Sequence, residues 1–403
     1  MIVGAGPAGA TAARTLAAAG ASVTVLDRAE FPRHKPCGGG ISLRVLRRFP
    51  YLECELPRIA THTVSRLYLE GPDASAVVDA GEPAALMIRR LEFDALLVSL
   101  ATEAGATFAP RVDVAQARED ADGVTLTARD GREFRAPIVI AADGVHSVVA
   151  RRLGLNPGWP ASAVALDMME ETPRNQLRDL DPSTLWINYG ERGYSYVFPK
   201  RNHVNIGIGY VLSYFRDSVD AAPYELQRRF VATLRDRGIV AGDSVKQNFT
   251  PFLLPVSGPL TPPARGRVLA VGDAGGFVNA FTAEGIFYAM VSGELAAQAI
   301  LRSRHDLREA SPHYCRAADD EMGTELRDSV LIQRYLFQDR RRIGRAIRGA
   351  NHAGAITNLV RDLVVGRRTY AEVRLRILAR SPALAARTAW EYLLSRTAKI
   401  SRM

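Results

Sequence analysis

The chain contains 403 residues, 47% hydrophobic and 24% charged, which is typical of a globular protein with two domains or one domain carrying a large insertion. The net charge of +9 is unevenly placed, because residues 331–403 contain sixteen Arg or Lys against four Asp or Glu, whereas the preceding part is slightly acidic. This distribution argues against a protein that binds nucleic acid along its whole length, and three widely spaced cysteines argue against a disulfide framework or a metal site.

The first 28 residues predict a strand, a glycine-rich turn, a helix and a second strand. Gly4, Gly6 and Gly9 have the spacing G-x-G-x-x-G after the short apolar run MIV. Such glycines allow a tight turn, close approach of a pyrophosphate and close helix–strand packing. Asp27 ends the second strand, where a carboxylate binds ribose hydroxyls and disfavours a 2′-phosphate. We therefore predict an FAD or NAD site; glycines that serve packing alone are the alternative. The residues assigned to this site are Gly4, Gly6, Pro7, Ala8, Gly9, Asp27 and Arg28.

Residues 31–40 read FPRHKPCGGG, and three consecutive glycines bring no side chain to a core. Because glycine loses much backbone entropy on ordering, the run requires a functional reason. Cys37 lies at its start, and its thiol is either functional or an inert small hydrophobe. We assign the inert part to Cys54 and Cys315.

Residues 65–79 and 156–257 predict a second domain around an antiparallel sheet with one solvated side. Its strand-like runs alternate apolar and polar residues: SRLYLEGPDASAVVD, SAVALDMM, STLWINYG, YSYVFP and HVNIGIGYV. One helical stretch, APYELQRRFVATLRDRG, follows them. The aromatic residues of these strands would give a substrate cavity apolar walls, although an ordinary sheet core would also use them.

Two further predicted strands each end at an aspartate next to a glycine. The run RAPIVIAADGVHS ends at Asp143 and Gly144, and GRVLAVGDAGGFVNAFTAEGI ends its strand at Gly272 and Asp273. Asp273 can bind a ribityl hydroxyl, and the helix that begins near Gly285 and Ile286 can face a flavin's pyrimidine oxygen. The alternative is that both aspartates only cap helices.

Residues 331–403 predict basic helices, with apolar residues at i, i+3 and i+4 among arginines. Two interpretations stay open: peripheral docking on an anionic membrane, or packing on the body with solvated arginine faces. No secretory signal or spanning apolar run is evident. We therefore expect a cytoplasmic protein, peripheral at the inner face of the membrane if the tail docks there.

Together, the three glycine and aspartate segments resemble the p-hydroxybenzoate hydroxylase superfamily of FAD enzymes over nearly all of residues 1–300. RRLEFDALL is similar to the segment whose arginine, here Arg90, helps hold the FAD. The resemblance implies an α/β fold: a Rossmann-like FAD-binding domain of the glutathione reductase/p-hydroxybenzoate hydroxylase type, an antiparallel-sheet substrate domain and a C-terminal helical region. The predicted domains are 1–64, 80–155 and 258–330 for FAD, 65–79 and 156–257 for substrate, and 331–403 for the basic helices.

Within that superfamily, KPCGGGIS and GYSYVFPK resemble the geranylgeranyl reductase branch, with Tyr196 where tryptophan is usual. The resemblance implies that the glycines lie beside the isoalloxazine, leaving space for substrate, and that the Cys37 thiol positions an alkene or assists its protonation. The catalytic and cofactor-contacting residues would be Cys37, Gly38 and Gly39. The implied substrate-binding residues are Trp186, Tyr194, Tyr196, Phe198, Pro199 and Lys200.

The function implied is an FAD-dependent reductase that saturates isoprenoid C=C bonds of a geranylgeranyl lipid, diphosphate, chlorophyll precursor or quinone. Electrons would come from NAD(P)H or a ferredoxin-like donor, and the choice between them stays open because no second nucleotide fingerprint is seen. The alternatives are a flavin monooxygenase or halogenase on the same scaffold, and a non-catalytic FAD- or lipid-binding protein. No nucleic-acid partner is expected, and the oligomeric state is left open.

Overall fold

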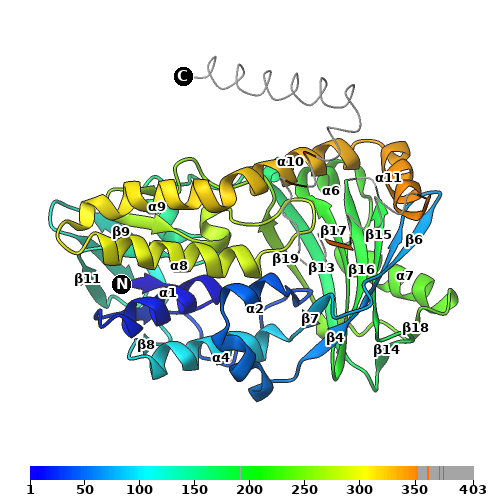
Figure 1. The fold of residues 1–403 in the computed structure, drawn as a ribbon, viewed down its shortest axis with the longest axis horizontal. Coiled ribbons are helices and arrows are strands. Elements are labelled where there is room, and N and C mark those ends of the chain that lie inside the picture. Colours follow the sequence, from blue (N-terminus) through cyan, green and yellow to red (C-terminus); the bar gives the residue numbers. More distant parts are fainter. Residues whose placement is uncertain (191, 353–360, 363–371, 373–374, 376–403) are drawn as a thin grey trace, which may run out of the picture.

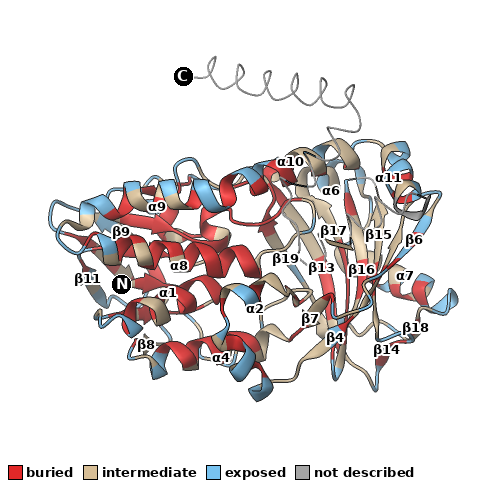
Figure 2. Cartoon of the chain, viewed as in Figure 1, coloured by how far each residue is buried: buried red, intermediate tan, exposed pale blue. Residues whose placement is uncertain are grey.

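The computed structural model describes residues 1–190, 192–352, 361–362, 372 and 375. Figure 1 shows helices gathered at the end that holds the N-terminus and a large sheet at the other end. In Figure 2, buried residues concentrate in the helical end, whereas the large sheet carries many half-buried residues. The two ends therefore differ in how far their residues are buried from solvent.

A six-stranded sheet lies at the centre of the helical end. Its order is β20 (Ala264–Arg265), β21 (Val268–Ala270), β12 (Val139–Ala141), β1 (Ile2–Val3), β2 (Thr24–Leu26) and β8 (Thr107–Ala109). Every neighbouring pair is parallel except β20 and β21. Strands β12 and β21 are wholly apolar and buried, as expected when both faces of a parallel sheet are covered.

Helices cover one face of this sheet. They are α1 (Pro7–Ala18), α4 (Arg90–Glu103), α8 (Ile286–Arg302) and, beyond α8, α9 (Ala310–Ala318). Small residues let α1 and α8 touch, since a Cβ on Gly293 would lie 2.1 Å from the carbonyl oxygen of Ala8. This is the predicted Rossmann-like arrangement, with a first strand of only two residues.

An antiparallel sheet of β9 (Val114–Glu119), β10 (Val124–Ala128) and β11 (Glu133–Ala136) covers the opposite face. Val114, Val124 and Leu126 share a buried cluster with Val3 and Val139 of the six-stranded sheet. The sequence analysis did not single out these strands, because their outward residues are mostly polar and they carry no motif.

A seven-stranded sheet forms the other end. Its order is β19 (Phe249–Pro255), β13 (Val164–Pro173), β17 (His203–Val211), β16 (Gly193–Pro199), β15 (Thr184–Gly190), β5 (Arg66–Glu70) and β6 (Ser75–Asp79). The predicted antiparallel sheet is thus confirmed, with one exception: β5 and β15 run parallel. The sheet unites residues 66–79 with 164–255, as the predicted domain division requires, and the exact division stays a prediction.

Helix α7 (Pro223–Asp236) covers one face of the large sheet, where Val231 and Leu234 pack on Val204 and Ile206. Two short strands, β14 (Leu177–Asp179) and β18 (Val240–Gly242), pair beside it. A small sheet of β3 (Gly40–Ser42), β7 (Ala85–Met87) and β4 (His62–Val64) joins the two ends. The other elements are short: α2 (Arg44–Arg48), α3 (Tyr51–Glu55), α5 (Val148–Arg152) and α6 (Leu212–Ser218).

Two helices close the described part of the chain. Helix α10 (Thr324–Phe337) crosses the predicted boundary at residue 331, and α11 (Arg340–His352) lies against β6. Ile343 and Ile347 of α11 are buried in a cluster with Ala76, so its apolar face packs on the body. Most of residues 353–403 lie outside the described residues, including most of the predicted second basic helix. No helix in the described ranges is long and apolar enough to cross a membrane.

The packing of α11 can be tested with Ile347→Ala. The variant should lower the free energy of unfolding by about 2 kcal/mol, because it leaves a cavity against Gly71, where Ile347 fits closely. Urea unfolding measures the loss. Arg345→Ala, on the exposed face, is the control and should change the value by less than about 0.5 kcal/mol. Equal effects of the two variants would contradict the packing.

Candidate active site

The glycine-rich turn after β1 has no room for side chains on the side that faces the rest of the protein. A Cβ on Gly9 would lie 1.9 Å from the carbonyl oxygen of Gly4, and a Cβ on Gly4 would lie 2.2 Å from that of Ala142. Gly4 also has a φ of +98°, which favours glycine. Gly6 differs, because a Cβ there would meet only the Arg33 guanidinium, 3.8 Å away. The turn is therefore open at Gly6.

Helix α1 begins directly behind this opening. Gly6 is its N-cap residue, Pro7 is its first residue, and no side chain caps it. The N–H groups and the positive dipole end of such a terminus bind phosphate oxygens. Ala8 follows in the first turn, and a Cβ on Gly272 would lie 3.1 Å from its methyl group. The opening, its uncapped helix and the nearby Gly272 turn fit the pyrophosphate of a dinucleotide.

Asp27 lies at the end of β2 beside the same turn. Its Oδ2 accepts a hydrogen bond from the Ala5 N–H at 2.7 Å, and its Oδ1 accepts one from the Ala29 N–H at 2.8 Å. The carboxylate thus fixes the glycine turn, and its remaining lone pairs are what a ribose would use. Arg28 is exposed. Its predicted part in cofactor binding stays a prediction.

Asp143 caps a helix, which was one of the two roles predicted for it from the sequence. Its carboxylate accepts hydrogen bonds from Ser147 Oγ at 2.5 Å and from the N–H groups of Val148 and Val149 at 2.7 and 3.2 Å. It therefore holds the start of α5. Gly144 beside it has open space where a side chain would project, so contact of this pair with the cofactor stays a prediction.

Asp273 and the start of α8 come together. A Cβ on Gly285, the N-cap residue of α8, would lie 3.8 Å from Asp273 Oδ1, and Ile286 is the first helical residue. Gly272 is held by its N–H, which donates to Ser292 Oγ at 2.9 Å. This places a carboxylate beside an uncapped helix N-terminus, an arrangement that suits the ribityl chain and ring oxygen of a flavin.

Arg90 lies in a buried charge cluster at the start of α4. Its Nε and Nη2 donate to the buried Asp94 at 2.6 and 2.7 Å, and Arg33 lies 3.1 Å from the same carboxylate. Burial lowers the pKa of Arg90, but Asp94 and the Cys37 sulfur outweigh it, so that the pKa is raised. The predicted FAD-holding arginine and the predicted catalytic thiol are therefore neighbours.

Lys35 lies close both to the predicted cofactor residues and to the large sheet. Burial lowers the pKa of its ammonium, with further influence from Arg90 and opposing influence from Asp273 and Cys37. Burial raises the pKa of Asp167, on the large sheet, and the same ammonium opposes that rise. The segment around residues 33–40 therefore lies between the cofactor residues and the sheet.

Gly38 and Gly39 are required by close packing on that sheet. A Cβ on Gly38 would lie 2.8 Å from Phe198 Cδ2, and one on Gly39 would lie 2.1 Å from the Ile88 carbonyl oxygen. Gly39 also has a φ of +74°. Its N–H lies 3.4 Å from Cys37 Sγ, which accepts the hydrogen bond. The glycines thus set the loop against an aromatic ring; their predicted contact with a flavin ring stays a prediction.

Lys200, which follows β16 of the large sheet, binds the backbone of this loop. It is almost completely buried, its ammonium pairs with Glu171, and it lies 3.4 Å from the Cys37 carbonyl oxygen. Burial raises the pKa of Glu171, but Lys200 and Arg89, which donates at 2.7 Å, outweigh it and lower the pKa. Asn205 Nδ2 donates to the same carbonyl at 3.3 Å. Lys200 therefore positions the loop, whereas direct contact with a substrate stays a prediction.

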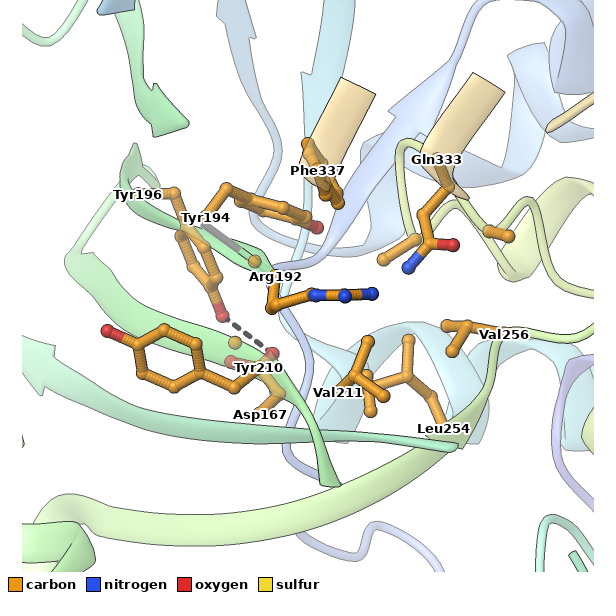
Figure 3. Close-up of a pocket in the computed structure, with 15 residues that line it drawn as sticks. Asp167, Arg192, Tyr194, Tyr196, Tyr210, Val211, Leu254, Val256, Gln333 and Phe337 are labelled. Atoms are coloured by element: carbon orange, nitrogen blue, oxygen red, sulfur yellow. Dashed lines mark hydrogen bonds between the residues drawn. The ribbon is translucent and has the colours of Figure 1, made fainter. Parts of the chain in front are cut away.

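A cavity opens on the loop side of the large sheet, and Figure 3 shows its lining. Tyr194, Tyr196 and Phe337 supply aromatic walls, and Asp167, Arg192, Tyr210 and Gln333 supply polar groups. The remaining lining residues are Ala165, Gly193, Gly209, Val211, Leu254, Val256, Ala280 and Ala283. The cavity is thus mostly apolar, and the two predicted tyrosines line it.

Phe198 lies between the cavity and the loop, with its ring centroid 4.4 Å from that of Tyr196. Trp186 does not join these rings. It lies opposite Val197 on the other face of the sheet and packs on Phe230 of α7, 6.0 Å between centroids. Pro199 is buried at the end of β16. The structure therefore brings Tyr194, Tyr196 and Phe198 together with Gly38, but not Trp186.

Asp167 was not singled out in the sequence, although it is the one acid among the apolar residues of SAVALDMM. It is half-buried as a residue, yet its Oδ1 is shielded from solvent and accepts no hydrogen bond within the described ranges. Its Oδ2 accepts a hydrogen bond from Tyr196 Oη at 3.0 Å. Burial raises its pKa to about 7, against the effect of Tyr196 and Lys35. An acid that titrates near neutral pH thus lines the cavity.

Comparisons with known proteins identify the cofactor and the family. A family model described as FAD binding domain matches residues 1–297. This chain is similar to menaquinone reductase from Mycobacterium tuberculosis (strain ATCC 25618 / H37Rv), with 32% identity over 323 residues, 75% of this chain and 76% of that protein. It is also similar to digeranylgeranylglycerophospholipid reductase 1 from Methanopyrus kandleri, with 32% identity over 348 residues, 84% of this chain and 89% of that protein.

The chain belongs to the geranylgeranyl reductase family of FAD-dependent oxidoreductases. As a member of that family it is an FAD-dependent oxidoreductase, which decides between the FAD and NAD predicted for the glycine turn. The predicted non-catalytic alternative falls away, and both predicted resemblances are confirmed.

Solved structures show the same fold. A geranylgeranyl bacteriochlorophyll reductase-like protein from Thermoplasma acidophilum superposes with a TM-score of 0.75 at 21% identity, covering 94% of this chain and 97% of that one. Halogenase PltM in complex with phloroglucinol and FAD gives a TM-score of 0.69 at 16% identity, covering 94% and 83%. At these identities the likeness concerns the fold, and the predicted fold class is confirmed.

The open space at Gly6 and the close contact at Gly9 predict different effects of alanine on FAD binding and on stability. Gly6→Ala should leave the unfolding free energy of the FAD-free protein within about 0.5 kcal/mol, because there is room for its methyl group. It should weaken FAD binding by about tenfold or more, because that methyl group enters the phosphate site. Gly9→Ala should instead destabilise the protein itself by about 1–3 kcal/mol, through overpacking on Gly4.

Urea unfolding of both FAD-free variants and titration with FAD, followed by flavin fluorescence, separate the two effects. A Gly6→Ala variant that binds FAD as tightly as the original chain would contradict the assignment of the phosphate site.

Proposed function

We propose that the protein saturates isoprenoid C=C double bonds, using FAD as its redox cofactor. The observation that carries the proposal is the position of the Cys37–Gly39 loop. On one side it adjoins Arg90, and on the other its glycine contacts Phe198, whose ring lies against Tyr196 of the apolar cavity. A long apolar chain in the cavity would therefore approach the same loop that the cofactor residues approach.

In this proposal, different residues bind the cofactor, bind the hydrocarbon and position the double bond. Bound FAD in its reduced state supplies a hydride. Gly6, Pro7 and the start of α1 would hold its pyrophosphate, and Asp273 and the start of α8 would hold its flavin end, because both helix starts lack a side-chain cap. Tyr194, Tyr196 and Phe337 bind the hydrocarbon and exclude water from it. Cys37 faces the double bond from the loop and positions it.

The substrate class follows from chemistry that the relatives' named substrates share. Menaquinone and digeranylgeranylglycerophospholipid both carry prenyl chains, and the names of two relatives specify them. An apolar cavity with polar groups at its lining suits such a chain attached to a polar head. We propose a prenylated lipid, diphosphate or quinone as substrate, and NAD(P)H or a ferredoxin-like protein as the electron donor.

The function is tested by anaerobic turnover. Purified protein with FAD, chemically reduced, is mixed with geranylgeranyl diphosphate, digeranylgeranylglycerophospholipid or menaquinone, and mass spectrometry follows the gain of two hydrogens per double bond. Saturation without oxygen supports the proposal. Products that form only with oxygen would favour a monooxygenase or halogenase, whose fold the protein shares.

Cys37→Ala should leave FAD binding unchanged and lower the rate of double-bond reduction by about tenfold or more, because in this proposal the thiol contacts the double bond, whereas the pyrophosphate is held at Gly6 and the start of α1. The flavin absorbance spectrum reports binding, and anaerobic single turnover reports the rate. Cys54→Ala, at an exposed cysteine remote from the loop, is the matched control. Equal turnover by both variants at every double bond would remove Cys37 from the mechanism.

We further propose that the exposed arginines of α10 and α11 contact an anionic membrane, from which a prenyl lipid would enter. Arg341 and Arg345 lie on the solvent side of α11, whose apolar side is buried. Arg341→Glu combined with Arg345→Glu should weaken binding to phosphatidylserine vesicles by about tenfold or more.

Vesicle flotation measures this binding. Arg129→Glu combined with Arg132→Glu, on a distant exposed turn beside β10, is the matched control for added negative charge. Unchanged flotation of the α11 double variant, or equal loss in the control, would contradict a specific contact.

A further inference from the structure

We propose that the carboxyl group of Asp167, oriented by Tyr196, donates the proton that completes reduction of the double bond. The inference rests on the proposed function, which needs one proton as well as one hydride for every double bond saturated. Asp167 suits the task because it lines the cavity and keeps one shielded oxygen without a hydrogen-bond donor in the described part of the chain.

The direction of Asp167 follows from strand β13. Alternate residues of a strand point to opposite faces, so Asp167 and Glu171 share the cavity and loop face while Glu170 lies on the other. Glu170 is held there by Ser244 Oγ at 2.9 Å and the Val245 N–H at 3.0 Å. Figure 3 shows the bond from Tyr196 to Asp167 at the edge of the cavity. This bond holds Oδ2, whereas Oδ1 has no hydrogen-bond partner among the described residues that would compete for the proton.

The two carboxyl groups on this face have opposite environments. Glu171 has two cations, Lys200 and Arg89, which lower its pKa despite its burial. Asp167 has a neutral phenol as its hydrogen-bond partner and only a longer-range influence from Lys35, so burial dominates and its pKa rises to about 7. Environments that separate the pKa values of neighbouring acids in this way mark acid and base roles. Of the two acids on this face of β13, Asp167 is therefore the one that holds a transferable proton near neutral pH.

Other groups near the cavity suit this task less well. Burial raises the pKa of Tyr194 and Tyr196 well above 10, which makes both phenols weak acids. Cys37 Sγ already accepts a hydrogen bond from the Gly39 N–H, which suits a positioning role on the loop. The titratable and charged groups that face Asp167 or share its cavity and loop are His34, Lys35, Cys37, Glu171, Arg192, Tyr194, Tyr196, Lys200 and Tyr210.

The step is balanced in atoms and electrons. One alkene carbon receives a hydride, with its electron pair, from reduced FAD. The other carbon receives a proton as the O–H bond of Asp167 breaks and a C–H bond forms. The π bond is consumed, Asp167 is left as a carboxylate, and solvent returns its proton before the next cycle.

The first test is the pH dependence of anaerobic single turnover on the three prenyl substrates named above. Because the acid must be protonated, the rate should be high below pH 7 and fall as the pH rises through about 7. Asp167→Asn keeps an acceptor for Tyr196 but has no proton to give. It should lower the rate about 100-fold or more and abolish the fall. Tyr196→Phe removes a bond that lowers the pKa of Asp167, so the fall should move to higher pH.

The matched control is Glu170→Gln. Glu170 lies on the same strand and burial also raises its pKa to about 7, but it faces away from the cavity. Glu170→Gln should keep the pH profile of the original chain.

The second test does not depend on turnover. Infrared difference spectra of the oxidised holoprotein at pH 6 and pH 8 should contain a carboxylic acid C=O band that Asp167→Asn removes and Glu170→Gln retains. An Asp167→Asn variant that binds FAD and keeps the original rate and pH profile would overturn the inference while leaving the proposed function intact. An original chain that saturates none of the three substrates would overturn the proposed function, and the acid role with it.

Discussion

The contact between the Cys37–Gly39 loop and the large sheet determines how the two ends of the molecule work together. Lys200 and Asn205 reach the Cys37 carbonyl oxygen from the sheet, and the glycines leave space for Phe198 and the Ile88 carbonyl. A side chain at Gly38 or Gly39 would separate these surfaces. Without this contact, the residues that would hold FAD and the cavity that would hold a hydrocarbon would not meet.

Burial of charge is the cost of that contact, and the structure offsets it unevenly. Lys200 is nearly inaccessible, but Glu171 neutralises it and Arg89 shares the carboxylate. Arg90 and Arg33 are likewise paired with Asp94. Buried ion pairs of this kind contribute little net stability, because desolvation opposes their attraction, yet the loss of one partner is strongly destabilising. The charge pairs therefore fix the loop's position more than they stabilise the fold.

The sequence predicted those features that depend on local pattern. The spacing of Gly4, Gly6 and Gly9 identified the turn, and alternation of apolar residues identified the strands β13, β15, β16 and β17. It did not predict which face of a strand meets the cavity, because register depends on pairing between distant residues. Trp186 illustrates this: it lies opposite Val197 rather than Tyr196, so it faces α7. Asp143 shows the same limit, since only the folded turn reveals that its oxygens bind α5.

Asp167 is a buried acid without a cation partner in the described part of the chain, and its environment could not be predicted from the sequence. In the sequence it is a single acid within an apolar run, and nothing in that run tells whether it is paired. The fold supplies cations for Glu171, four residues further along the same face, and a phenol for Asp167. An unpaired buried acid is costly once it ionises, so a site under pressure for stability alone would give Asp167 a cation or an apolar replacement. Its place in an apolar cavity beside the Cys37–Gly39 loop fits the proposed saturation of a double bond, in which a hydride alone would leave a carbanion and a proton must also arrive.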